Sequence, residues 1–487
     1  MVAAHLERGL LDAIIMMDTA MKHNQMGHPV SANLTATEQQ YFYGPPATDT
    51  SALDSPLGPL EYDATFAGKG ILSFPLIDGK QPVWASAIIK LQGTDIRYLA
   101  SFYETLSSAN PDGYKNTAGL LCFDSHGFID TSFGDKGISP VSFSKTDYTM
   151  PLQLIVLNSG DFLIAGYLTT FDAPYIYISM MLCKHKADGT LDTRFGDEGL
   201  INLTQATGMN LNPIGITELA DGKIMIAASL AEEGPYRSYM IRLEAQGRFD
   251  ASFGENGIKA FTKPNSNATG TKGIKPYEGG NKIIWYGNHY ETGIYTASMA
   301  RLDMDGNPDH DFGVDGFLDM PTGDSYNAIA NLYISPEENS VLVLGEGYKS
   351  QISGMSAMLM RYLPDGDPDV TFNNGLPMYL KFHESAINNY WTVAGTPSDL
   401  TGKIIVSGNG SRGPNDSWSA VARFDADGKL DTTFAYGKGI GSPTNAHFFP
   451  NGGKYVYEQS RVLCCGTSLG TAAVIALKNG PPKASAN

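Results

Sequence analysis

One short phrase, written seven times at nearly constant spacing, constrains this chain more than any other feature. Each copy holds an Asp and, three residues later, a Phe, usually between Gly-containing turns. The copies are Asp63 and Phe66, Asp130 and Phe133, Asp192 and Phe195, Asp250 and Phe253, Asp309 and Phe312, Asp369 and Phe372, and Asp431 and Phe434. The Asp residues recur every 58 to 67 positions. Self-similarity at a fixed period indicates an array of units that fold alike.

Length and charge agree with an array and narrow the choice of partners. A chain of 487 residues exceeds the length at which one hydrophobic core usually stops growing. Its 34 Lys and Arg against 51 Asp and Glu give a formal net charge of -17. Such a field repels nucleic acid and anionic membrane surfaces. We therefore expect a glycan or protein ligand, no nucleic-acid binding and no membrane insertion.

The four cysteines do not form a disulfide framework at this length. Cys122 and Cys183 lie in strand-like runs, and Cys464 and Cys465 would point to opposite faces of one strand. We expect all four to be buried thiols.

The start of the chain lacks the pattern of a conventional signal peptide. Glu7, Arg8 and Asp12 interrupt the region where an apolar core would lie, and no apolar run has membrane-spanning length. The pattern fits a cytoplasmic protein or one exported without a conventional leader, and the sequence does not separate the two.

Residues 1–58 lie outside the array. One apolar helical face is predicted there, because apolar residues recur at spacings of three and four: Leu6, Leu10, Ile14, Met17 and Met21. The Pro-rich stretch from Gly44 to Pro59 reads as an extended linker. The helix is expected to dock, either as a cap on the array or as an export or partner-binding tag.

Within residues 59–487, each unit has four short runs rich in Ile, Val, Tyr and Phe. In one unit they are Gly199 to Leu203, Pro213 to Leu219, Lys223 to Ser229, and Ser238 to Leu243. Short runs of this composition, broken by Gly, Asp and Asn, are strands. Turn sequences such as Asp221-Gly222 join the second run to the third. Each unit is therefore predicted to be a four-stranded antiparallel meander.

Seven such meanders predict an all-β fold, a seven-bladed β-propeller with the N-terminal helical extension. A propeller protects its sheet edges by radial repetition. An open solenoid is the alternative, although its repeats are typically shorter and its strands parallel. Whether the chain ends share strands in one closing blade depends on which run is innermost, and the sequence leaves this open.

The repeated phrase resembles the delta-60 repeat of bacterial proteins. The resemblance rests on stretches such as Asp188-Gly189-Thr190-Leu191-Asp192-Thr193-Arg194-Phe195-Gly196 and covers about residues 61–480. It implies a bacterial, propeller-like module and brings no established activity or site residues with it.

The phrase itself is predicted to be structural. Its Asp can accept hydrogen bonds from backbone amides one to three residues on, and its Phe can pack between sheets. Five units add a cation eight residues before the Asp: Lys184, Arg242, Arg301, Arg361 and Arg423. Pairing of each cation with its Asp would satisfy both groups. The first unit ends with Cys122 at this position and the seventh with Ile475, so we expect no such pairing near the ring ends.

Two loops resemble calcium-binding loops, but we expect no bound calcium. Asp303-Met304-Asp305-Gly306 and Asp425-Ala426-Asp427-Gly428 alternate Asp as calcium loops do. Calcium takes six to eight oxygens, however, and both loops lack a third alternating Asp and a bidentate Glu.

A meander separates its connections onto two faces. We call the face with the repeated phrase the constant face and the opposite one the variable face. The variable face collects aromatic residues, which are candidate ligand contacts: Tyr103, Tyr175, Tyr177, Tyr236, Tyr239, Tyr290, Tyr295 and Trp418. The alternative is that these rings only pack onto neighbouring blades.

No catalytic motif is found. The nine His residues form no zinc-spaced pair, and no nucleophile elbow or phosphate loop occurs. The sequence therefore favours a non-enzymatic binding module. A propeller enzyme of hydrolase or lactonase type with a site at the central channel is the first alternative, and an architectural part of a bacterial surface or toxin assembly is the second.

Overall fold

The computed structural model describes 17 segments of the chain. These are residues 58–77, 79–91, 95–104, 116–144, 147–172, 175–230, 237–266, 268–291, 294–321, 325–349, 355–382, 388–395, 402–413, 416–443, 448–458, 461–468 and 471–478. The helix predicted within residues 1–58 lies outside them. The α-helix found in the described part is the short α2 (Leu203–Thr207), and no described helix is long and apolar enough to cross a membrane.

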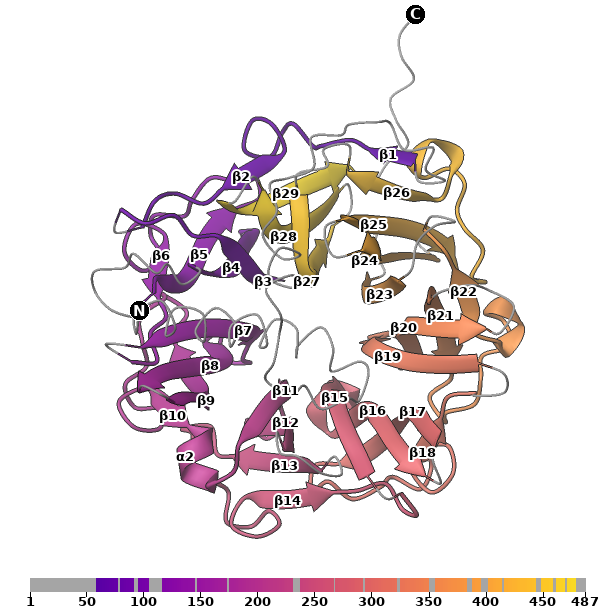
Figure 1. The fold of residues 1–487 in the computed structure, drawn as a ribbon, viewed down its shortest axis with the longest axis horizontal. Coiled ribbons are helices and arrows are strands. Elements are labelled where there is room, and N and C mark those ends of the chain that lie inside the picture. The colour runs from indigo at the N-terminus through magenta and orange to yellow at the C-terminus, as the bar shows by residue number, and fades with distance from the viewer. Residues whose placement is uncertain are drawn as a thin grey trace, which may run out of the picture.

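Seven sheets surround a common axis (Figure 1), which confirms a seven-bladed propeller of four-stranded antiparallel blades. The innermost strands, from blade 1 to blade 7, are β3 (Trp84–Lys90), β7 (Tyr148–Val156), β11 (Leu211–Glu218), β15 (Ala268–Tyr277), β19 (Ser325–Ile334), β23 (Asn388–Gly395) and β27 (Phe448–Tyr457). The second strands are β4 (Arg97–Tyr103), β8 (Phe162–Asp172), β12 (Ile224–Leu230), β16 (Lys282–Glu291), β20 (Val341–Lys349), β24 (Lys403–Gly413) and β28 (Arg461–Ser468).

The third and outer strands complete each blade. The third strands are β5 (Ala118–Asp124), β9 (Tyr175–His185), β13 (Ser238–Leu243), β17 (Ile294–Asp303), β21 (Ser356–Tyr362), β25 (Asp416–Asp425) and β29 (Thr471–Lys478). The outer strands are β6 (Ile138–Pro140), β10 (Leu200–Asn202), β14 (Ile258–Phe261), β18 (Phe317–Asp319), β22 (Met378–Leu380), β26 (Ile440–Pro443) and β2 (Ile71–Ser73). Three 3-10 turns, η2 (Glu278–Gly280), η3 (Asn373–Gly375) and η4 (Ala435–Gly437), lie in connections. The outer strands have only three or four residues, which limits the exposed edge of each sheet.

One expectation about the repeat is wrong: a sequence unit is not a blade. The first run of each unit is the outer strand of the preceding blade. β10 pairs with β9 in blade 2, whereas β11, β12 and β13 belong to blade 3. The repeated Asp and Phe therefore lie between the third and outer strands of one blade.

The ring closes through the beginning of the described chain. β2 pairs antiparallel with β29, with Leu72 opposite Val474, and so completes blade 7. The stretch predicted as a linker ends in a further strand, β1 (Gly58–Leu60), which pairs parallel with β26 of blade 6. The N-terminal strands thus join two blades before the chain enters blade 1.

Every innermost strand carries an irregularity in its pairing with the second strand. In β19 it falls between Ile329 and Asn331. The bulged backbone approaches Gly345 of β20 so closely that a Cβ there would lie 1.9 Å from the carbonyl oxygen of Ala328. A side chain at this position would force the two strands apart.

In the described residues, one hydrophobic cluster lies between each pair of neighbouring blades, and each of these seven clusters includes one Phe of the repeat. Phe195, for example, packs with residues of blades 2 and 3 such as Leu182 and Ile226. All seven rings are at most 1% exposed. All four cysteines are buried free thiols, as predicted, and Cys464 and Cys465 face different clusters.

Candidate functional site

Each repeated Asp shapes the link that follows its third strand. Asp250 Oδ1 accepts hydrogen bonds from the backbone amide of Ser252 at 3.0 Å and from its hydroxyl at 2.6 Å. The same two bonds join Asp130 to Ser132, Asp369 to Thr371 and Asp431 to Thr433. These Asp turns direct the chain from the third strand to the outer one.

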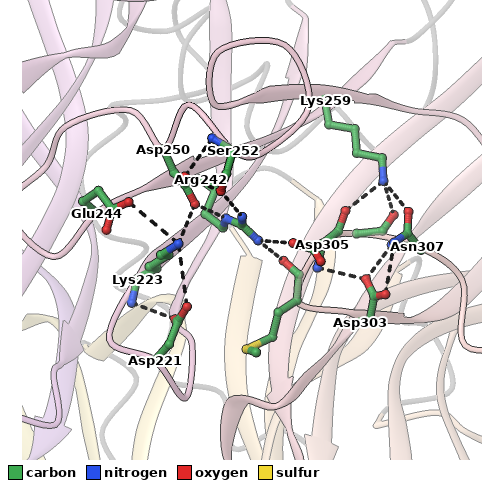
Figure 2. Close-up of polar contacts among 12 residues, drawn as sticks. Asp221, Lys223, Arg242, Glu244, Asp250, Ser252, Lys259, Asp303, Asp305 and Asn307 are labelled. Atoms are coloured by element: carbon green, nitrogen blue, oxygen red, sulfur yellow. Dashed lines mark hydrogen bonds and ion pairs between the residues drawn. The ribbon is translucent and has the colours of Figure 1, made fainter.

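The cation eight residues earlier extends this link into a joint between blades (Figure 2). Arg242 Nε donates to Asp250 Oδ2 at 2.7 Å, while its Nη1 donates to the Met304 carbonyl and to Asp305 Oδ1 of blade 4, each at 2.7 Å. The guanidinium carbon lies 4.6 Å from the centre of the Phe253 ring. One side chain therefore pairs with a buried carboxylate, covers the ring and holds the next blade.

The same ion pair recurs around the ring. Nε donates to the carboxylate from Arg301 to Asp309 at 2.7 Å, from Arg361 to Asp369 at 2.6 Å and from Arg423 to Asp431 at 2.7 Å. In three blades a Lys at the start of the second strand also reaches the Asp: Lys223 to Asp250, Lys282 to Asp309 and Lys403 to Asp431, at 2.8, 2.9 and 3.0 Å.

The prediction that the ring ends lack a cation is wrong. In blade 1, Arg97 Nη1 of β4 lies 3.0 Å from Asp130 Oδ2. In blade 7, Arg461 Nη1 of β28 lies 3.5 Å from Asp63 Oδ2. Both arginines stand at the start of the second strand, so the spacing along the chain that identified Arg242 could not identify them.

The joint keeps its carboxylates ionised. Burial alone would raise the pKa of Asp250, yet hydrogen bonds from Lys223, Ser252 and Arg242 hold this pKa well below its usual range. The pKa is lowered at the other six repeated positions as well: Asp63, Asp130, Asp192, Asp309, Asp369 and Asp431. The constant face is therefore held together by charge at neutral pH.

The loop from Asp303 to Asn307, considered above for calcium, instead binds the ammonium group of Lys259 (Figure 2). Lys259 Nζ donates to the carbonyls of Asp305 and Gly306 at 2.8 and 3.0 Å and to Asn307 Oδ1 at 2.9 Å. Asp303 Oδ1 accepts from the backbone amides of Asp305 and Asn307. The Lys259 ammonium group is thus bound by oxygens of Asp305, Gly306 and Asn307. In the described part of the chain no group of three or more His, Cys, Asp or Glu is arranged for a metal.

Three hairpins project on the variable face. The pairing of β8 with β9 runs to Asp172 and Tyr175, that of β16 with β17 to Glu291 and Ile294, and that of β24 with β25 to Gly413 and Asp416. By contrast, β12 and β13 stop pairing at Ser229 and Ser238. Blades 2, 4 and 6 therefore carry longer hairpins than blade 3.

Five of the predicted ligand contacts occupy these hairpins. Tyr175 and Tyr177 lie in β9, Tyr290 and Tyr295 face each other across β16 and β17, and Trp418 faces Gly410 across β24 and β25. The Tyr177 side chain is 53% exposed and that of Tyr290 is partly buried. The side chains of Tyr175, Tyr295 and Trp418 fall outside the described part.

The remaining predicted contacts differ. Tyr103 packs against the cluster of Tyr148, Met150 and Tyr167. Tyr239 packs against the core between blades 2 and 3. For these two, packing onto neighbouring elements accounts for the ring. Tyr236 lies outside the described residues.

A Ser, His and Asp cluster in blade 4 was missed by sequence reasoning. Ser298 Oγ donates to Asp319 Oδ1 at 2.6 Å and lies 2.6 Å from His289 Nδ1. The hydroxyl stands between the other two groups, whereas a nucleophilic triad has its His in the middle. Ser298 and His289 are buried, so the cluster ties β16, β17 and β18 together. Only the strand register brings these residues together.

The pKa of one carboxyl group is shifted in the opposite direction from the pKa values of the repeated Asp residues. Burial raises the pKa of Glu346 on β20 to about 7, and the positive charge of Lys272 on β15 opposes this shift. Burial lowers the pKa of Lys272 in turn. Neither residue belongs to the repeated phrase, so the periodicity gave no signal for them.

The seven similar sheets and the repeated ion pairs define a repeat propeller. A family model of a β-propeller domain matches two parts of the chain. Residues 219–253 and 401–434 match a family model described as domain of unknown function (DUF5122) beta-propeller. Both stretches end in the repeated phrase, at Phe253 and Phe434. No curated protein matches the chain.

Solved structures with similar folds are distant. The alpha-L-arabinanase of Penicillium chrysogenum, complexed with arabinobiose, is 11% identical, with a TM-score of 0.40 over 72% of this chain and 98% of its own. The β-propeller domain of the trilobed protease from Pyrococcus furiosus is 10% identical, with a TM-score of 0.37 over 69% and 83%. The polysaccharide lyase Uly1 is 10% identical, with a TM-score of 0.43 over 88% and 98%. Likeness at this level carries no argument about activity.

Proposed function

We propose that the protein is a non-enzymatic binding module whose ligand contacts the variable face. The observation that carries the proposal is the projection of three hairpins on that face, with Tyr177, Tyr290 and Trp418 at ladder positions beyond those paired in blade 3. A rigid scaffold that presents variable loops is a common arrangement for binding. The charged joints lie on the constant face, which leaves the hairpins to vary without loss of the ring.

The ligand we favour is a neutral glycan. Aromatic rings offer flat apolar surfaces with a polar edge, and the β24 and β25 hairpin adds the neutral polar residues Ser411 and Ser417. A sugar needs both kinds of contact, and it is not repelled by a chain with a net charge of -17. A protein surface is the alternative ligand. As separate proposals, we infer that the repeats are of the delta-60 kind and that the helix expected within residues 1–58 docks on the propeller or on a partner.

The test is a glycan array probed with four forms of the full chain. Tyr177→Ala and Trp418→Ala should each reduce binding at least tenfold. The matched control is Phe128→Ala, which removes an aromatic ring that is 67% exposed but lies on the constant face, and it should bind like the wild type. Binding that all three variants share equally would contradict the proposal. A protein ligand would show as capture by a protein array with the same dependence on Tyr177 and Trp418.

A hydrolase of propeller type is the second candidate, and the carboxyl group to test in it is that of Glu346, which is buried on β20. If a bound glycan is cleaved and Glu346→Gln abolishes cleavage while binding persists, the protein is an enzyme. An architectural role would instead leave every array blank.

A further inference from the structure

A group of apolar side chains is exposed on the constant face of blades 4 and 5. They are Val314 (79% exposed), Leu363 (38%), Val370 (72%) and Leu376 (62%), and we call them the apolar patch. Nine large hydrophobic residues are exposed in the described part of the chain, and four belong to this patch. Exposed apolar groups that gather in one place mark an interaction surface.

The repeat supplies internal controls, because other blades fold in the same way without these residues. The position of Leu363 is charged in five other blades: Asp124, Lys186, Glu244, Asp303 and Asp425. Its backbone is the same, since Leu363 N donates to Asp367 O at 2.8 Å as Glu244 N donates to Arg248 O at 2.7 Å. The position of Val314 is acidic in three blades: Asp135, Asp197 and Glu255. The fold therefore does not require apolar residues here.

The patch spans the joint between the two blades. Gly313 N donates to the Asp365 carbonyl at 2.7 Å, which holds Val314 beside the turn that begins at Leu363. A Cβ at Gly375, the residue before Leu376, would lie 3.5 Å from Val370 and from Pro368, and Pro368 pairs with Tyr362, the residue before Leu363. The four residues therefore come from two contacting links of neighbouring blades.

The described chain begins at blade 6, next to blade 5. A Cβ at Gly58 would lie 2.0 Å from the carbonyl oxygen of Ala435, in the constant-face link of blade 6. That link neighbours blade 5, because Asn373 N donates to the Asp427 carbonyl at 3.0 Å. Residues 22–57 separate Gly58 from the N-terminal apolar stretch. A coil of that length spans roughly 35 Å, enough to return to the neighbouring blade.

We propose that residues 6–21 of the same chain dock on the apolar patch as an amphipathic helix. Its apolar face would consist of Leu6, Leu10, Ile14, Met17 and Met21, and it would cover Val314, Leu363, Val370 and Leu376. Docking removes both apolar surfaces from water, which neither achieves alone. This inference concerns the constant face and is independent of ligand binding on the variable face.

The test is amide hydrogen exchange of residues 6–21 in the full chain. The double variant Val314→Asp with Leu363→Glu gives the patch residue types that other blades carry at these positions. In the wild type, exchange within residues 6–21 should be at least tenfold slower than the intrinsic rate, and the double variant should lose this protection. Leu76→Asp is the matched control, because Leu76 is 64% exposed outside the patch, and it should keep the protection.

Two results would overturn the proposal. The first is intrinsic exchange of residues 6–21 in the wild type. The second is protection that the double variant retains while its melting temperature stays unchanged. A second copy as occupant would appear as a dimer in light scattering that dissociates on dilution together with the protection, and that outcome also contradicts docking within one chain.

Discussion

Arg242 of blade 3 places its Nη1 2.7 Å from Oδ1 of Asp305, in the turn that follows β17 of blade 4 (Figure 2). The arginine is buried, whereas the Asp305 side chain is 68% exposed. The contact therefore runs from the interior of one blade to the rim of the next. Among the described strands, none of one blade pairs with a strand of the next, so such contacts and the Phe clusters decide how neighbouring blades are oriented.

Removal of this arginine should destabilise the ring strongly. Arg242→Met leaves Asp250 buried with fewer donors, and loss of one partner of a buried pair costs about 3 to 5 kcal/mol. The control is Arg194→Met, whose side chain is 77% exposed although it also contacts a repeated Asp, Asp192. An exposed pair contributes about 0 to 1 kcal/mol. Urea unfolding would measure both, and equal losses would contradict the importance of the buried joint.

Acid should unfold the protein cooperatively. The pKa of all seven repeated Asp residues is lowered in the folded state. Their stabilisation is present above the ordinary pKa of Asp, about 4, and is lost as pH falls through the lower folded values. We expect the free energy of unfolding to fall steeply below about pH 4. Asp250→Asn should be less stable than the wild type at pH 7 and should lose less on acidification, and parallel curves for the two proteins would contradict this account.

Glu346 should make the free energy of unfolding fall as the pH rises from 5 to 7.5. Its pKa is raised from 4.5 to about 7 in the folded state, so the native protein holds a proton that the unfolded chain releases. Its contribution is complete below about pH 4.5 and is lost as pH rises through 7, by up to about 1.4 kcal/mol per pH unit. Glu346→Gln should remove this slope, whereas Glu255→Gln, on an exposed turn, should keep it. Urea unfolding at both pH values measures the difference.

The closing strand should be sensitive to a single charge. Leu72 of β2 is buried and lies opposite Val474. Leu72→Asp puts an unpaired carboxylate into the core between blades 7 and 1, at a cost of about 3 kcal/mol or more. Leu76→Asp makes the same change four residues later at a side chain that is 64% exposed. Thermal unfolding should separate the two variants, and similar melting temperatures would show that β2 does not secure the ring.

The number and kind of blades could be predicted from the sequence because each blade repeats one pattern. Turn residues such as Gly222, with a φ of 82°, and the buried Phe of each unit carry that pattern in the chain itself. The division of strands between blades could not be predicted, because β10 is equally short and apolar whether it joins blade 2 or blade 3.

The arginines of the ring ends show a second reason why residue spacing along the sequence does not reveal every ion pair. Arg423 was identified because it lies eight residues before Asp431, within one strand and its link. Arg461 is separated from Asp63 by almost the whole chain, and closure of the ring alone brings the two together. For the same reason the pairs Ser298 with Asp319 and Lys272 with Glu346 emerge only from the three-dimensional register.

The one-strand offset between sequence unit and blade bears on how a chain of this kind can change in length during evolution. A duplicated unit would bring an outer strand for the blade before it and three inner strands for a new blade, and one of the resulting seams would join two copies of the same blade. Gain or loss of a whole unit would therefore leave every blade with four strands and would alter the curvature of the ring. The strand that closes the circle is the exception, since β2 comes from the other end of the chain and has to meet whichever blade is last.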